Sequence, residues 1–140
     1  MTRLAAVDPG PGIVRALMAK RPLVCLVDDD ESVRESLPDL LREFGYDVRA
    51  HASARAFLDG GCVAGCDCLI LDIAMPEMTG PELLQELRRG GNVVPVVFIT
   101  AQCDEDIGKR DLRSDAVACL LKPFSQAAIL QALHIALGQR

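Results

Sequence analysis

The chain is 140 residues long, half of them hydrophobic and a quarter charged, a composition that suits one compact domain and excludes a disordered chain. No run approaches the roughly 18 consecutive apolar residues of a membrane span, and the first residues lack the apolar core of a signal peptide, so we expect a cytoplasmic protein. The net charge of −5 is uneven: residues 1–21 hold four basic side chains and one acidic, whereas residues 22–140 hold eleven and nineteen. This acidic body argues against direct binding to nucleic acid or an anionic membrane.

Five short segments are expected to form strands, of which four are apolar runs and the second is a weaker candidate. They cover residues 23–27, 47–51, 68–72, 94–99 and 117–121. The first run is apolar without interruption, which is typical of a parallel strand buried on both faces. The fourth is the most β-prone run in the chain.

Helical segments separate these runs. Apolar residues recur at helical spacing over 31–44, 80–89 and 125–137, and shorter helices are expected at 53–58 and within 104–115. The alternation predicts right-handed crossovers and an α/β fold of the (βα)5 type, a doubly wound five-stranded parallel sheet with helices on both faces. We expect residues 1–21 to form a flexible N-terminal extension and residues 22–140 to form the domain.

Polar residues stand at the carboxyl ends of four predicted strands. They are Asp28-Asp29-Asp30, Asp72, Thr100 and Lys122-Pro123. Singly, each has a simpler explanation as a helix cap, a turn or a loop residue. In a parallel sheet, however, these ends share one edge, where ligands bind near a change in strand order. Clustered carboxylates repel one another unless a cation neutralises them, and oxygen ligands suit Mg²⁺. Carboxylates, lysine, hydroxyl and Mg²⁺ together predict phosphoryl transfer to a carboxylate.

Four segments in this order resemble the receiver domain of bacterial two-component response regulators and are most similar to its FixJ-type subgroup. They are Val27–Glu31, Leu71–Gly80, Ile99–Ala101 and Leu121–Phe124. The resemblance extends from residue 22 to residue 138. It implies a flavodoxin-like receiver fold and a role in phosphorelay signal transduction. It also implies that the chain is not a conventional enzyme but a phosphoprotein that catalyses its own phosphorylation and dephosphorylation.

By this resemblance, Asp72 accepts a phosphoryl group from a sensor histidine kinase or phosphotransfer protein and becomes an aspartyl phosphate. Asp28, Asp29, Asp72 and the backbone carbonyl of Ala74 hold Mg²⁺, with Asp28 acting through water. Lys122 pairs with the phosphoryl oxygens.

Thr100 takes part in the switch that the resemblance implies, and other residues are expected to shape the backbone around the site. Thr100 hydrogen-bonds to the phosphoryl group and moves inward, which shifts a conformational equilibrium. The Lys122–Pro123 peptide is expected to be cis. Met75-Pro76 and Gly80 are expected to shape the loop after Asp72, the glycine by permitting a backbone angle that other residues resist.

Two positions are expected to modulate the lifetime of the acyl phosphate. Ala74 leaves the site open to water, and Gln102 would orient an attacking water, so we expect moderate to fast dephosphorylation. The alternative is that Gln102 is simply exposed. At the switch position, Cys119 replaces the Tyr or Phe that is usual in the family three residues before the lysine, so the output mechanism does not transfer with the resemblance.

With no output module after the last predicted helix, we expect a stand-alone receiver that acts on a downstream protein partner, and a homodimer is left open. Cys119 motivates an alternative, a phosphorylation-independent interaction module of the same fold. Partner binding with and without a phosphoryl mimic separates the two. A phosphatase of the haloacid dehalogenase type is disfavoured, because that family needs a second aspartate where this chain has Ala74.

The sequence contains six cysteines, which we expect to be free thiols in the absence of an export signal. The cluster Cys62-x-x-x-Cys66-x-Cys68 lacks zinc-knuckle spacing and has no histidine nearby in the sequence. It therefore predicts small buried or half-buried residues rather than a metal site. A thiol sensor at Cys103 and Cys119 is an alternative that only their presence supports.

Overall fold

The computed structural model describes residues 21–101 and 116–138. Its elements are β1 (Leu23–Val27), α2 (Glu31–Glu43), β2 (Asp47–His51), α3 (Ala54–Asp59), β3 (Cys68–Asp72), α4 (Gly80–Arg89), β4 (Val96–Thr100), β5 (Ala118–Leu121) and α7 (Gln126–Gly138). The helix expected within residues 104–115 and the N-terminal extension, apart from Arg21, lie outside the described residues.

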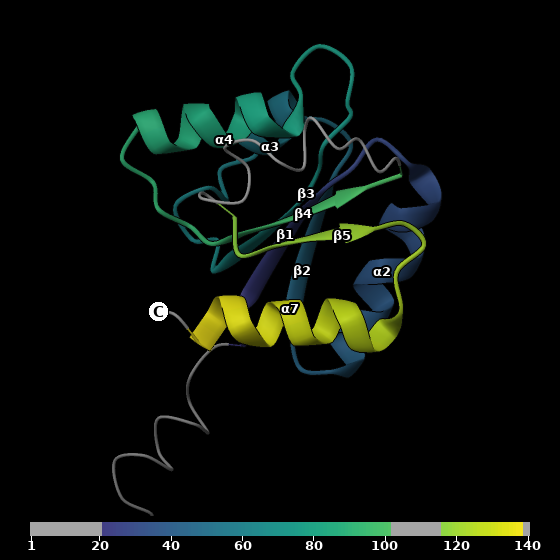
Figure 1. The fold of residues 1–140 in the computed structure, drawn as a ribbon. Helices are drawn as coiled ribbons and strands as arrows, with labels where there is room; N and C mark the ends of the chain where they lie inside the picture. The colour runs from purple at the N-terminus through teal and green to yellow at the C-terminus, as the bar shows by residue number, and fades with distance from the viewer. Residues whose placement is uncertain (1–20, 102–115, 139–140) are drawn as a thin grey trace, which may run out of the picture.

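The five strands form one parallel sheet in the order β2-β1-β3-β4-β5. Helices α3 and α4 lie on one side of this sheet, and α2 and α7 lie on the other (Figure 1). The predicted α/β fold is therefore confirmed. The fourth strand begins at Val96 instead of residue 94, because Pro95 has no N–H to donate to the strand ladder.

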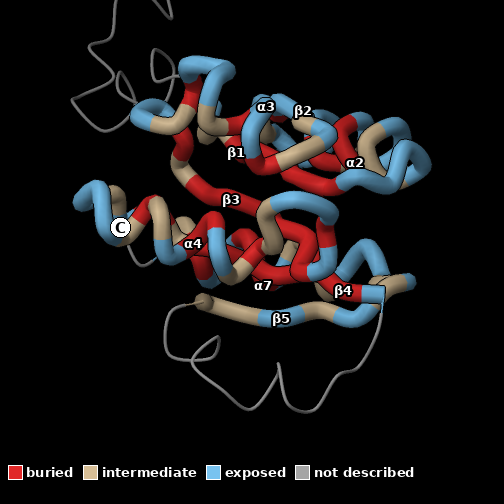
Figure 2. The backbone as a smooth tube through the Cα atoms, turned by 90° about the horizontal axis from the view of Figure 1, so that it is seen from above, coloured by how far each residue is buried: buried red, intermediate tan, exposed pale blue. Residues whose placement is uncertain are grey.

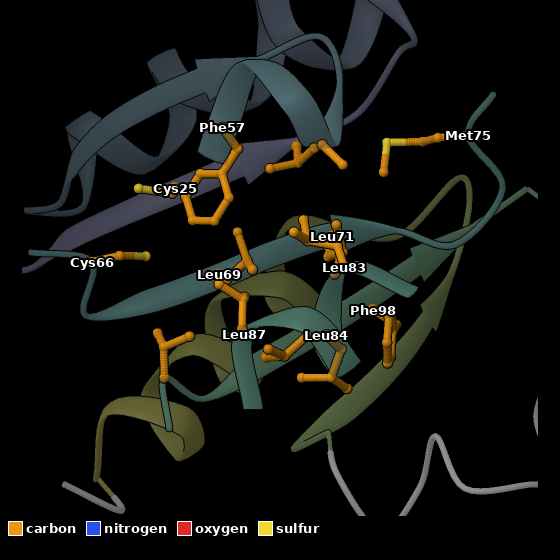
Figure 3. Packing of buried hydrophobic residues seen from close by; sticks show 14 of the residues in the cluster. Cys25, Phe57, Cys66, Leu69, Leu71, Met75, Leu83, Leu84, Leu87 and Phe98 are labelled. Atoms are coloured by element: carbon orange, nitrogen blue, oxygen red, sulfur yellow. The ribbon is translucent and has the colours of Figure 1, made fainter. Parts of the chain in front are cut away.

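The central strands are the most deeply buried part of the molecule (Figure 2). Every residue of β3 and β4 is buried, whereas the edge strand β5 alternates between half-buried and exposed residues. Two apolar clusters fill the space between the sheet and its helices, one on each face. The cluster under α3 and α4 includes Phe57, Leu69, Leu83 and Phe98 (Figure 3). Among the described residues, no helix has the length and apolar character needed to cross a membrane.

Local sequence signals fix where the helices begin relative to the strand ends. The Asp30 side chain caps α2 by accepting the N–H of Ser32 at 2.9 Å. Thr79 and Glu82 form a reciprocal capping box at the start of α4, in which each side chain accepts a backbone N–H of the other residue. These caps fix the junctions between strands and helices at which the polar residues lie.

Candidate functional site

The predicted polar residues meet at the carboxyl edge of the sheet. The strand order reverses between β1 and β3, which places Asp28 and Asp72 on either side of the change in direction where ligands bind in such sheets. Thr100 ends the next strand, β4. In the described part of the chain, these three are the only polar or charged residues that are buried. Their burial at one edge confirms the expected juxtaposition.

The three consecutive aspartates, Asp28, Asp29 and Asp30, have different environments. Asp30 is the N-cap of α2, so the helix-cap explanation applies to this residue. Asp28 is completely buried, its Oδ1 accepts the Asp30 N–H at 2.9 Å, and its backbone carbonyl accepts a hydrogen bond from Arg34 at 3.0 Å. Asp29 is exposed beside it. The chain thus anchors Asp28 firmly and leaves the carboxylate of Asp29 toward solvent.

Lys122 reaches the carboxylates from the end of β5. Its backbone N–H donates to the Thr100 carbonyl at 2.7 Å, which fixes it beside β4, and the Lys122–Pro123 peptide is cis as predicted. The Nζ atom lies 2.7 Å from Asp28 Oδ2 and 3.7 Å from Asp72 Oδ1. Asp28 Oδ2 is buried and accepts no hydrogen bond from another described residue beyond this ion pair.

The site carries more negative than positive charge. Burial, followed by the charge of Asp28, raises the pKa of Asp72 to about 7, although Lys122 acts in the opposite direction. Burial favours the neutral amine of Lys122, but its hydrogen bond to Asp28 and the surrounding carboxylates outweigh burial and raise the Lys122 pKa. The ammonium therefore remains charged, and one positive group faces three carboxylates.

These residues fit a hard divalent cation. Carboxylate oxygens from Asp28, Asp29 and Asp72 all lie within 4.8 Å of one another. Oxygen-only donors of this kind suit Mg²⁺, which keeps several of its waters. A divalent cation would also neutralise the excess negative charge and compensate the buried oxygen of Asp28. Ala74 is exposed two residues after Asp72, which leaves this side of the site open.

The loop after Asp72 is shaped differently from our expectation. Gly80 does not have a positive φ, and its role is close approach: a Cβ atom there would collide with the Asp72 carbonyl oxygen. The Gly80 N–H donates to the Ile73 carbonyl at 2.9 Å. The positive φ of this loop, 71°, lies at Glu77, inside a γ-turn that the Met78 N–H closes on the Pro76 carbonyl at 2.8 Å. Neither the close approach at Gly80 nor the γ-turn at Glu77 could be predicted from residue type alone.

The remaining predicted positions have mixed outcomes. Cys119 is exposed on β5, opposite Phe98 of β4, and Gln102 lies outside the described residues. The described cysteines form no disulfide with one another, and Cys62, Cys66 and Cys68 are all buried, as predicted. Cys103 lies outside the described residues, so the thiol-sensor alternative stays untested.

The sequence is similar to those of several known proteins. The sequence matches the family model of the response regulator receiver domain over residues 24–134. The transcriptional regulatory protein FixJ of Azorhizobium caulinodans is 40% identical over 116 residues, which cover 83% of this chain and 55% of FixJ. The response regulator protein TodT of Pseudomonas putida is 33% identical over 124 residues, covering 89% of this chain and 55% of TodT.

Solved structures show the same likeness. The structure of the response regulator StyR superposes with a TM-score of 0.78 at 39% sequence identity, covering 85% of this chain and 60% of StyR. The chain spans about half the length of the curated relatives that it matches, 55% of both TodT and FixJ.

Proposed function

This chain belongs to the response regulator receiver domain family, and from that premise we propose that Asp72 is the phosphoacceptor of its two-component signalling function. The observation that carries the assignment is the position of the Asp72 carboxylate. It is buried at the end of β3, has Lys122 Nζ 3.7 Å away, and has carboxylates of Asp28 and Asp29 within 4.8 Å. A nucleophile, a mobile cationic side chain and a cation-binding oxygen set thus converge on one point.

The reaction follows from these groups. A carboxylate oxygen of Asp72 attacks the phosphorus of a phosphohistidine, the new O–P bond forms as the N–P bond breaks, and the imidazole nitrogen keeps the electron pair. The product is an acyl phosphate on Asp72. Mg²⁺, when bound, supplies charge neutralisation for the phosphoryl oxygens, and Asp28, Asp29 and Asp72 are the residues that would hold it, with the Ala74 carbonyl as a further ligand.

Lys122 and Thr100 would respond to the added group. Lys122 Nζ is already nearer to Asp28 than to Asp72, at 2.7 Å against 3.7 Å, so a phosphoryl group on Asp72 offers the ammonium a new negative partner. The hydroxyl of Thr100, at the end of the adjacent strand β4, would hydrogen-bond to the same group. These differential contacts bias the domain toward a second conformation.

The partners are proposed at the level of class. A sensor histidine kinase or phosphotransfer protein supplies the phosphoryl group, and a downstream protein reads the phosphorylated state. The cytoplasmic location and the boundary between residues 1–21 and 22–140 remain predictions from the sequence. Because Ala74 is exposed, water can reach the acyl phosphate on Asp72. We therefore propose that the acyl phosphate hydrolyses with a half-life much shorter than many hours at room temperature.

Phosphorylation is tested by intact-protein mass spectrometry after incubation with acetyl phosphate. We expect one Mg²⁺-dependent phosphoryl group on the natural chain and none on Asp72→Asn. Asp67→Asn is the matched control, since this carboxylate lies before β3, where it accepts the Leu23 N–H at 2.8 Å, and it should be phosphorylated normally.

A second measurement tests the site even if the phosphoryl adduct hydrolyses before it can be detected. Beryllofluoride, a stable phosphoryl mimic, should bind the natural chain in the presence of Mg²⁺ and should not bind Asp72→Asn. An adduct that persists on Asp72→Asn would refute the assignment of Asp72. Failure of both the adduct and the mimic would favour the phosphorylation-independent interaction module.

A further inference from the structure

A second group of metal-ligating side chains lies away from the carboxylates, between the sheet and α3. The Sγ atoms of Cys25 and Cys62 are 3.7 Å apart, and Cys62 Sγ is 3.3 Å from Nε2 of His51. The three potential ligand atoms all lie within 4.8 Å of one another. Phosphoryl transfer to Asp72 makes no use of any of them.

Three separate segments bring these atoms together. Cys25 lies inside β1, His51 ends β2, and Cys62 follows α3. The His51 ring is held by an edge-on contact with Phe57, with ring centroids 5.5 Å apart. The sequence predicted no metal site because the cysteines lack zinc-knuckle spacing and have no histidine nearby along the chain, whereas the fold brings His51 to Cys62 from eleven residues away. Cys68, by contrast, belongs to the apolar cluster on the opposite face of the sheet.

A third sulfur, that of Cys66, lies near the group. Cys66 belongs to the same apolar cluster as Cys25 and Cys62, and its thiol donates to the Cys68 carbonyl at 3.1 Å. Cys25 and Cys66 lie near each other at one end of the apolar cluster, close to Phe57 (Figure 3). The surroundings thus provide two close sulfurs, one imidazole nitrogen and a third sulfur in the same cluster.

The spacing matches that of a tetrahedral thiolate centre. With Zn–S bonds of about 2.3 Å, two sulfurs on a tetrahedral zinc ion are about 3.8 Å apart, close to the 3.7 Å between Cys25 and Cys62. Sulfur and imidazole donors select soft or borderline cations over Mg²⁺. His51 is only partly buried and Cys62 is 9% exposed, which leaves an approach from solvent.

We propose that Cys25, Cys62 and His51 bind a thiophilic divalent cation of the zinc type, with the fourth coordination position left to a solvent molecule or, after rotation of its side chain, to Cys66. This site is distinct from the Mg²⁺ site because its donors are sulfur and nitrogen rather than oxygen. It also adjoins that site, since the His51 carbonyl accepts the Asp28 N–H at 3.1 Å. A cation here would join β1, β2 and the segment that follows α3.

The test titrates the reduced, metal-free full chain with Zn²⁺ against a chromophoric chelator, in excess Mg²⁺ so that the carboxylates are occupied. We expect one equivalent of Zn²⁺ to bind. Cys62→Ser and His51→Gln should each weaken binding by at least about tenfold, since even outer partners of metal ligands have effects of that size. The matched control is Cys119→Ser, which changes an exposed cysteine on β5 and should leave the affinity unchanged.

Cobalt provides a readout that does not depend on the variants. Co²⁺ bound to the natural chain should show sulfur-to-metal charge-transfer bands and the visible bands of a tetrahedral centre. Circular dichroism of each variant separates loss of a ligand from loss of the fold. The proposal is overturned by a Co²⁺ spectrum without sulfur bands, by binding that survives in folded Cys62→Ser, or by thiols that only form a Cys25–Cys62 disulfide in air and bind no metal.

Discussion

Asp72→Asn should stabilise the fold at pH 8 in the absence of Mg²⁺. Burial and Asp28 raise the Asp72 pKa from 3.8 to about 7, so the folded chain holds a proton that the unfolded chain has lost between these values. Stability therefore falls as pH rises through this window. The shift spans about three pKa units, which at roughly 1.4 kcal/mol each sets an upper limit of about 4 kcal/mol. Asparagine has no proton to lose and avoids this cost.

Urea unfolding at pH 5 and pH 8, with and without Mg²⁺, tests the argument. The gain in the free energy of unfolding for Asp72→Asn should be about two to three times as large at pH 8 as at pH 5, and Mg²⁺ should reduce it by stabilising the natural chain. Asp39→Asn, which changes a surface carboxylate that is 82% exposed, should show neither effect. An equal gain at both pH values, or a loss at pH 8, would refute the repulsion that we place at this site.

Three other substitutions test separate parts of the site. Gly80→Ala should lower the free energy of unfolding by about 1–3 kcal/mol, because its methyl group would meet the Asp72 carbonyl; an unchanged urea midpoint would contradict that contact. Lys122→Met should slow phosphorylation by acetyl phosphate about a hundredfold and destabilise the fold at pH 8 by about 3 kcal/mol, because Asp28 would be buried without its partner; rates from mass spectrometry and urea unfolding check both. Asp29→Asn should weaken Mg²⁺ binding at least about tenfold by isothermal titration while changing stability little, since Asp29 is exposed; a large gain in stability would count against this.

The fold could be predicted from the sequence because the hydrophobic pattern of each segment matches the burial of the strand or helix that it forms. Leu23–Val27 is uninterrupted in its apolar character and is a buried strand, and Gly45 and Gly90 follow helices that end where expected. Residue type alone could not predict the close approach between the backbone at Gly80 and the backbone at Asp72. Gly80 was expected to have an unusual φ, whereas the packing of α4 against the Asp72 carbonyl is what excludes a side chain.

The carboxylate edge was equally predictable, because parallel strands place their carboxyl ends together whatever the side chains are. The sulfur cluster was not, because it depends on strand register. Cys25 is paired with Arg49, so His51 lies two residues further along the neighbouring strand and on the same face as Cys25. The register between β1 and β2 brings Cys25 and His51 together, and the path of the chain after α3 brings Cys62 to these two residues.

The apolar sheet and the charged edge are parts of one energetic arrangement. Burying Asp28 and Asp72 beside a single ammonium costs free energy, and the fully buried strands β3 and β4 offset that cost. A bound divalent cation, or a movement of the Lys122 ammonium, would reduce the repulsion between these carboxylates. The affinity for the cation and the instability of the unliganded fold therefore have the same origin. A substitution that removes the Asp72 carboxylate should therefore raise stability and lower Mg²⁺ affinity together. The exposed Asp29, which contributes to binding more than to repulsion, should separate the two quantities.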